Sequence, residues 1–133
     1  MSKQSEPWTQ EDFRGFALTL PEAHESSHMG RADLRVRNKI FATLPEDGRT
    51  VNLKTTPIAL DMLIRSDPET YRDVWGGRWV GVQLARVTAG ELKELVIEAY
   101  GLAAPKKLAA TARLLLEQSL TKSNRGRGKG SHG

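Results

Sequence analysis

The stretch from Leu34 to Lys54, LRVRNKIFATLPEDGRTVNLK, decides the fold. Apolar and basic residues alternate strictly over 34–37, which is typical of a strand with one buried face. The segment 39–44, with consecutive apolar residues at 40–42, predicts a second strand, and the PEDG sequence at 45–48 is a strong signal of a hairpin turn. The alternation returns over 50–54. We therefore expect this stretch to form the centre of a small antiparallel sheet.

The alternation also assigns side chains to the two faces of that sheet. The residues expected to point inward are Leu34, Val36, Val51 and Leu53, and those expected to point outward are Arg35, Arg37, Thr50, Asn52 and Lys54. Three consecutive apolar residues at 40–42 leave the orientation of the middle strand open. Asn38 tolerates left-handed backbone geometry and marks a tight turn or a bulge before that strand.

Helix signals lie on both sides of this stretch. Thr9, Thr56 and Thr88 stand at N-cap positions before apolar stripes of helical spacing. The expected helices cover 9–20, 57–66, 88–101 and a last segment that opens at Pro105. The other expected segments are a β-permissive stretch at 24–30, a connection at 30–33, an irregular or single-turn segment at 68–77 and a strand at 79–84.

These elements predict the fold class. Four helical stripes and about five short strands, joined by hairpin-length connections, indicate a two-layer α+β fold. We expect one antiparallel sheet with helices mainly on one face. A length of 133 residues suits a single core, so we expect one domain over 1–120 and a separate tail over 121–133.

The composition excludes several classes of protein. The chain has no cysteine, which removes disulfides, thiolate chemistry and cysteine-based metal sites. No apolar run approaches the roughly 20 residues of a membrane span, and the polar N-terminus lacks the apolar core of a signal peptide. We therefore expect a cytoplasmic protein that does not bind membranes.

The net charge of +4 comes from the tail. The sequence TKSNRGRGKGSHG at 121–133 holds four basic residues and no acid; taking these four from the 20 basic residues leaves 16, which equals the 16 acids. Such a tail buries too little apolar surface to offset its ordering entropy, so we expect it to be disordered. Nonspecific contact with nucleic acid and simple solubilisation are both open as its role.

The sequence HESSH at 24–28 matches the H-E-x-x-H pattern of zinc proteases. That chemistry needs a helix, which brings both histidines to one metal ion. The segment follows the helix-ending Pro21 and favours a strand, in which residues four apart lie roughly 13 Å from each other. We therefore expect no metal at His24 and His28. The chain also lacks a G-x-S-x-G elbow and a phosphate loop, so we expect no cofactor and no catalytic residues.

Four basic residues form the candidate nucleic-acid site, namely Arg35, Arg37, Lys39 and Lys54. The two arginines alternate with inward residues, and the two lysines can join them from neighbouring strands. Four cations on one sheet face or hairpin rim would suit contacts with phosphates.

The other interpretation of these cations is an ordinary solvated strand face. Nearby acids would balance them, namely Asp33, Glu46 and Asp47, and the neutral balance of 1–120 slightly favours this interpretation. Exposed aromatic side chains close to the cations would favour nucleic-acid binding instead. The candidates for that role are Trp75 and Trp79, although such residues are more often part of a core.

Several short pieces occur in a characteristic order. They are LPE at 20–22, Gly30, LRV at 34–36, KIFA at 39–42, VNLK at 51–54, WV at 79–80, EL at 91–92 and EAY at 98–100. In this order and spacing the chain resembles the MmcQ/YjbR family of small bacterial proteins over roughly residues 11–110. The resemblance implies helices packed on an antiparallel sheet. Members of the family are commonly called DNA-binding proteins, and no catalytic residues are established for them. Asn38 stands where a glycine is frequent in the family, and the basic tail is extra.

Two hypotheses for the function follow. The first is a non-catalytic module with DNA as its partner, which places its four candidate cations on phosphates and adds nonspecific affinity through the tail. The second is a protein- or small-ligand-interaction domain that uses the surface around Tyr71, Trp75 and Trp79. An enzyme ranks third.

Overall fold

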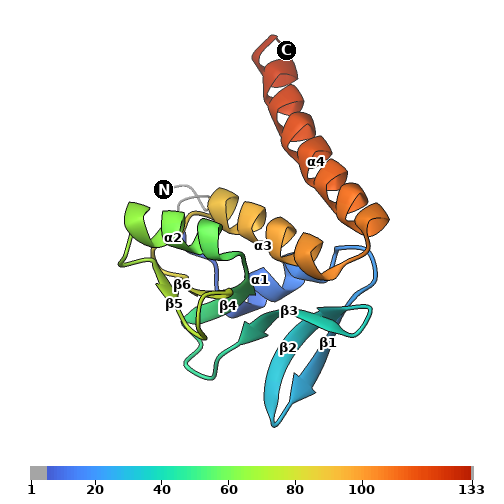
Figure 1. The fold of residues 1–133 in the computed structure, drawn as a ribbon. Helices are drawn as coiled ribbons and strands as arrows, with labels where there is room; N and C mark the ends of the chain where they lie inside the picture. The colour runs from blue at the N-terminus through green and yellow to red at the C-terminus, as the bar shows by residue number, and fades with distance from the viewer. Residues whose placement is uncertain (1–5, 133) are drawn as a thin grey trace.

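The structure, a computed structural model, describes residues 6–132, with side chains described as far as Ser119 (Figure 1). Its helices are α1 (Gln10–Ala17), α2 (Pro57–Ser66), α3 (Ala89–Ala103) and α4 (Lys106–His132). Its strands are β1 (Ala23–His28), β2 (Arg31–Val36), β3 (Lys39–Leu44), β4 (Thr50–Lys54), β5 (Tyr71–Asp73) and β6 (Trp79–Gln83). All paired strands are antiparallel, so the α+β prediction is confirmed.

The strand order is β1-β2-β3-β4-β6-β5, which places β3 and β4 in the middle of one six-stranded sheet. The stretch that the sequence singled out is therefore the centre of the sheet, as predicted. Two strand assignments were wrong. β2 begins at Arg31 rather than Leu34, because a tight turn with positive φ at Met29 and Gly30 pairs Arg31 directly with His28. β5 lies inside the segment expected to be irregular, and its three residues are too few to show a periodicity.

A bulge in β3 explains the three consecutive apolar residues. Leu34 pairs with Ala42 but Arg35 pairs with Ile40, so Phe41 is an extra residue in the ladder. Phe41 and Ala42 are both fully buried, and the ring of Phe41 meets Tyr100 of α3 edge-on with centroids 5.6 Å apart. Ile40 is left on the opposite face of the sheet.

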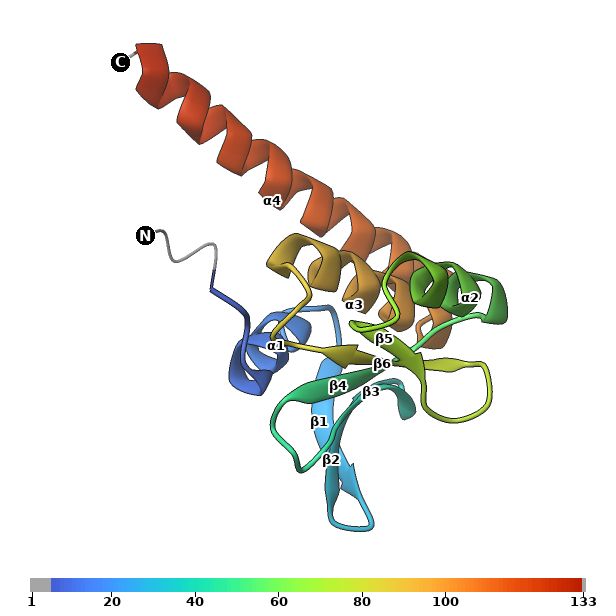
Figure 2. The same cartoon turned by 90° about the vertical axis from the view of Figure 1, so that its left-hand side faces the viewer.

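The helices α1, α2 and α3 lie on one side of the sheet, as Figure 2 shows from the side. α3 packs mainly over β3 and β4, and α2 packs on β5. The predicted N-caps are confirmed: Thr9 and Thr88 each form a capping box, and Thr56 accepts a hydrogen bond from the backbone N–H of Ala59. α1 ends at Ala17, three residues before the predicted end at Leu20.

α4 begins after Pro105 and packs its first turns on α3. Ala112 and Leu116 are buried there, and Arg113 Nη1 lies 2.6 Å from Glu94 Oε1. The helix then extends away from the body of the protein and continues to His132, through the tail expected to be disordered (Figure 1). Side chains after Ser119 and all of Gly133 lie outside the described part, so the domain boundary at 120 and the disorder of the tail stay predictions. Among the helices described, none has the length and apolar character needed to cross a membrane.

Candidate functional site

Within residues 6–132, no helix lies on one of the two faces of the sheet. A row of paired residues crosses this face from β2 to β5 and consists of Asp33, Thr43, Asn52, Gly81 and Arg72. Directly paired residues project to the same side of a sheet. We call this surface the open face. Figure 2 shows that the helices lie on the other side of the sheet.

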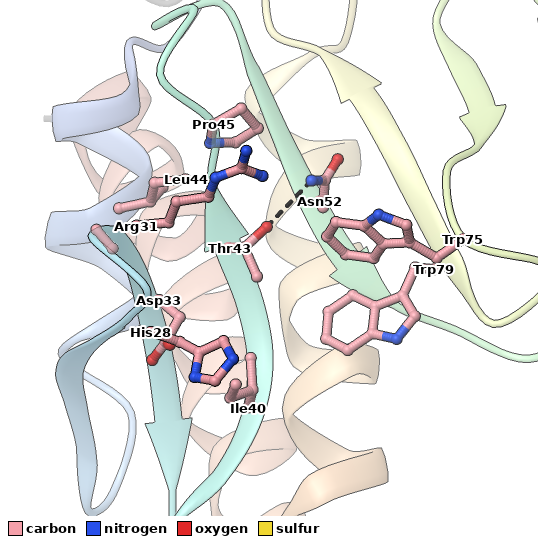
Figure 3. A pocket seen from close by; sticks show the side chains of 11 residues that line it. His28, Arg31, Asp33, Ile40, Thr43, Leu44, Pro45, Asn52, Trp75 and Trp79 are labelled. Carbon is pink, nitrogen blue, oxygen red and sulfur yellow. Dashed lines mark hydrogen bonds between the residues drawn. The ribbon is translucent and has the colours of Figure 1, made fainter.

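The open face contains a hollow of about 280 Å³, which we call the Trp hollow (Figure 3). It is lined by the apolar Ile40, Leu44, Pro45, Trp75 and Trp79, by the polar Thr43 and Asn52 at its base, and by His28, Arg31 and Asp33. Figure 3 shows the two tryptophans on one side of the hollow and His28 with Asp33 on the other. The hollow therefore joins strands from both halves of the sheet.

An amide forms the base of the hollow. Asn52 is only 7% exposed, and its Nδ2 donates a hydrogen bond to Thr43 Oγ1 at 3.0 Å. The sequence placed Asn52 and Thr50 outward, and both do point to the open face, but both are buried there. Gly81 is needed beside Asn52, because a Cβ at this position would lie 2.7 Å from Val74 Cγ1 and 3.3 Å from Asn52 Oδ1.

The two tryptophans come from the turn WGGRW. Asp73 Oδ1 accepts hydrogen bonds from the backbone N–H groups of Trp75, Gly76 and Gly77 at 2.9–3.2 Å, which fixes the turn. Trp75 is 53% exposed, and its ring meets that of Trp79 edge-on with centroids 5.4 Å apart. An exposed aromatic side chain, the feature expected to favour nucleic-acid binding, is thus present at Trp75.

Tyr71 does not share this surface. It is buried and pairs with Val82, which in turn pairs with Val51, so it projects toward the helices. Burial raises the pKa of its hydroxyl. The interaction surface expected around Tyr71, Trp75 and Trp79 therefore reduces to the two tryptophans.

Arg35 lies on the open face but is already paired. Its Nε and Nη2 donate to the two carboxylate oxygens of Asp33 at 2.8 and 3.1 Å, and Asp33 is only 2% exposed. This bidentate hydrogen bonding raises the pKa of Arg35 above its usual value. The charge of Arg35 is thus balanced within its own strand.

The alternation predicted that Arg37 points outward beside Arg35, and this prediction was wrong. β2 ends at Val36, and Arg37 and Asn38 form the hairpin turn with φ of 51° and 68°. The turn interpretation of Asn38 is confirmed, and it moves Arg37 off the strand face. Arg37 Nη2 donates to Glu22 Oε2 at 3.0 Å, and this pairing lowers the pKa of Glu22.

The two predicted lysines lie apart. Lys39 opens β3 at the hairpin end, opposite Val36. Lys54 ends β4 on the open face, with its Nζ 5.3 Å from the ring centroid of Trp79. Arg35 and Lys54 share the open face with β3 between their strands, about 10 Å apart by ordinary strand spacing. The four predicted cations therefore do not form one cluster.

Sequence reasoning missed two cations of the open face, Arg31 and Arg72. Arg31 was assigned to a connection, and Arg72 to an irregular segment, so neither received a strand face. Of the strand residues in the described part, the register places four cations on the open face, namely Arg31, Arg35, Lys54 and Arg72, and one acid, Asp33. The pairing of Asp33 with Arg35 could have been predicted, because residues two apart on a strand share a face.

The HESSH segment is strand β1, which confirms the premise of the zinc argument. His24 and His28 project to the open face, whereas Glu25 projects to the other side and pairs with Arg14 of α1 at 2.7 Å. Within the part of the chain that the structure describes, no group of three or more His, Asp or Glu side chains is arranged to hold a metal ion. The expectation that these histidines bind no zinc stays a prediction.

The fold and the open face define a class of two-layer α+β proteins with a helix-free sheet surface, and comparison with known proteins identifies it. The model of the YjbR family matches residues 18–102, and the chain belongs to this family. The predicted resemblance is therefore confirmed.

Two solved structures share the fold. The Deinococcus radiodurans protein DR2400, described as having the domain DUF419, is 23% identical with a TM-score of 0.66, and the match covers 74% of this chain and 80% of that one. A Pseudomonas syringae protein is 15% identical with a TM-score of 0.58 over 73% of this chain and 100% of its own. No curated protein matches the sequence significantly.

Proposed function

We propose that the protein is a non-catalytic nucleic-acid-binding module and that its open face is the interface. The proposal rests on the open face, where the half-exposed Trp75 lies. On this face the cations of the described strands outnumber the acids. Cations supply the affinity for phosphates, and exposed aromatic rings supply contacts with bases. DNA is the partner that the family resemblance implies.

The balance of charges decides which cations bind phosphates. Arg35 already forms a salt bridge with Asp33, so we assign the phosphate contacts to Arg31, Lys54 and Arg72. Arg31 and Arg72 are exposed, and Lys54 lies beside Trp79. These three residues replace the set Arg35, Arg37, Lys39 and Lys54 as the proposed phosphate contacts, with only Lys54 in common.

The dimensions of the open face fit an extended strand of nucleic acid. The row from β2 to β5 crosses four strand intervals, which corresponds to about 19 Å at ordinary spacing. Arg31 and Arg72 lie on strands at the two ends of this row, with the tryptophans between them. A single strand can therefore lie across the sheet and contact cations on both sides of the Trp hollow.

A salt titration with single-stranded DNA tests the proposal. Each phosphate contact contributes about 0.7 to the slope of log affinity against log salt. Deleting 121–133, with its four cations, should lower the slope by up to about 2.8, and replacing Arg31, Lys54 and Arg72 by alanine in the shortened protein should lower it by about 2 more.

Arg65→Ala is the matched control, because Arg65 is an exposed cation on α2, on the covered side of the sheet, and pairs with Asp61. It should leave the slope unchanged. Undetectable binding by the tail-deleted protein at low salt would exclude the open face as the interface and leave the tail as the source of any affinity.

A second candidate function is supported by the Trp hollow itself. A mostly apolar hollow with an amide at its base is also suited to a small planar molecule. In that case the protein would be a small-ligand-binding domain without a nucleic-acid partner, as the second hypothesis from the sequence holds.

A further inference from the structure

The size of the Trp hollow limits what it can hold. Its volume of about 280 Å³ lies just below the range of about 300–1,000 Å³ that is usual for ligand pockets. It therefore suits one ring system with few substituents. Its apolar surface comes from Ile40, Leu44, Pro45 and the two tryptophans, which favours a flat, apolar face on the occupant.

The tryptophans offer two differently oriented surfaces. Their ring planes are inclined by 75°, so a ring stacked on one indole meets the edge of the other. Edge-to-face and offset-stacked arrangements are the favoured contacts between aromatic rings. A planar heterocycle is thus held from two sides.

The base of the hollow adds polar recognition. A side-chain amide has two N–H donors and two acceptor sites, and Asn52 uses one donor, on Thr43 Oγ1. Among the described residues, Thr43 Oγ1 accepts that bond and is the donor in none. Among the described residues no buried side-chain nitrogen or oxygen atom lacks a hydrogen-bond partner, so the remaining hydrogen-bonding sites of Asn52 are open to solvent and to a ligand in the hollow. The edge of a nucleobase carries both donors and acceptors and can bind to these sites in place of water.

We infer that the Trp hollow binds one unpaired nucleobase, which makes the open face selective for single-stranded over duplex nucleic acid. The inference rests on the proposed function and deepens it. In a duplex the faces of a base are stacked and its pairing edge is occupied, so a base can enter the hollow only after it is flipped out. A single strand does not require this step.

Three probes of equal length test the inference with the full chain: a short single-stranded oligonucleotide, an abasic strand with the same phosphates, and the duplex. The single strand and the abasic strand carry the same phosphates for the tail to contact, so the difference between their affinities reports on the bases. We expect the single strand to bind about 5- to 150-fold more tightly than the abasic strand, which corresponds to one stacked base. The duplex should bind less tightly than the single strand.

Variants locate the base contact. Trp75→Ala should remove most of the advantage of the single strand over the abasic strand, and Trp75→Phe, which keeps an aromatic face, should retain most of it. Trp75 lies in an exposed turn, so neither change removes core packing. Asn52→Ala tests the polar base of the hollow independently.

The outcomes separate the inference from the proposed function. Equal, salt-dependent affinities for the single strand and the abasic strand would overturn the inference and leave phosphate binding by the module intact. An advantage of the single strand that persists in both Trp75→Ala and Asn52→Ala would also overturn it. No binding to any of the three probes would overturn the proposed function and, with it, the inference.

Discussion

At the scale of single residues, Arg35 shows how one contact changes the role of a cation. The sequence offered it as a phosphate ligand, whereas the structure shows it as the partner of a carboxylate that is almost fully buried. Removing one member of such a pair leaves the other charge without its hydrogen bonds, which costs more than the pair itself contributes.

We expect Arg35→Ala to lower the free energy of unfolding by about 1–3 kcal/mol, because Asp33 is left unpaired. Urea denaturation measures the change. The double replacement Arg35→Ala with Asp33→Ala should recover part of the loss. The exposed pair of Arg65 and Asp61 is the control, and Arg65→Ala should cost about 0.5 kcal/mol or less. Equal losses at the two arginines would contradict the structural role given to Arg35.

Asp47 is the residue through which acid should weaken the β3–β4 hairpin. Its carboxylate accepts hydrogen bonds from the backbone N–H groups of Arg49 and Thr50, at 2.8 and 3.1 Å, and from the hydroxyl of Thr50. The bond from Arg49 is the main reason that the pKa of Asp47 is lowered. These bonds also provide the buried hydroxyl of Thr50 with a hydrogen-bond partner.

A carboxyl group whose pKa is lower in the folded protein stabilises the fold above its unfolded pKa, and this stabilisation is lost as the pH falls through the folded pKa. For Asp47 the loss should therefore begin below about pH 4. We expect Asp47→Asn to be less stable than the parent at neutral pH and to lose less stability between about pH 4 and pH 2. Thermal unfolding across that range measures both. Parallel pH curves would show that Asp47 does not contribute.

At the scale of elements, the fit between β6 and the turn that carries Trp75 depends on a residue with no side chain. Replacing Gly81 by alanine would push Val74 and the amide of Asn52 away. We expect Gly81→Ala to lower the free energy of unfolding by about 1–3 kcal/mol through overpacking and to weaken binding at the Trp hollow.

Gly15→Ala is the control for this prediction, because Gly15 lies in α1 with open space at its Cβ position. That change should stabilise the protein by about 0.5–1 kcal/mol. Denaturation and binding measured on both variants check the pair. A neutral Gly81→Ala would mean that the turn moves without cost.

The elements also show what the sequence could reveal. β4 and the helix starts were predictable, because alternation and capping residues are local signals. The bulge at Phe41 was not predictable, because it depends on the pairing with β2 and not on the sequence of β3 alone. The strand β5 was not predictable either, because three residues are too few to show an alternation. Arg72 was missed because it lies in this short strand, and Arg31 was missed because its strand position depends on pairing with His28 across a tight turn. Trp75 and Trp79, in contrast, stood out in the sequence.

At the scale of the whole molecule, α4 begins on the packed domain and continues through the tail to His132. Its first turns are held by Ala112 and Leu116, whereas its last part carries glycines at 126, 128 and 130. Each glycine in a helix interior costs about 1 kcal/mol relative to alanine, and short isolated helices are marginal in water.

We therefore expect the backbone amides of 121–132 to exchange with solvent far faster than those of α3 and β4 in a hydrogen-exchange experiment. Adding single-stranded DNA should slow exchange at the tail and on the strands of the open face if both contact the ligand. Strong protection of the tail in the free protein would contradict the predicted disorder and support a stable helix up to His132.

The extra residue at Phe41 changes which side chains of β3 share a face of the sheet. Residues three apart on a regular strand project to opposite faces of the sheet. In β3 the extra residue reverses this, so Ile40 and Thr43 both project to the open face and both line the Trp hollow. Deletion of Phe41 alone would make the alternation of β3 regular: Ala42 would still face the core, Ile40 and Thr43 would still face the Trp hollow, and the core would lose one buried aromatic ring.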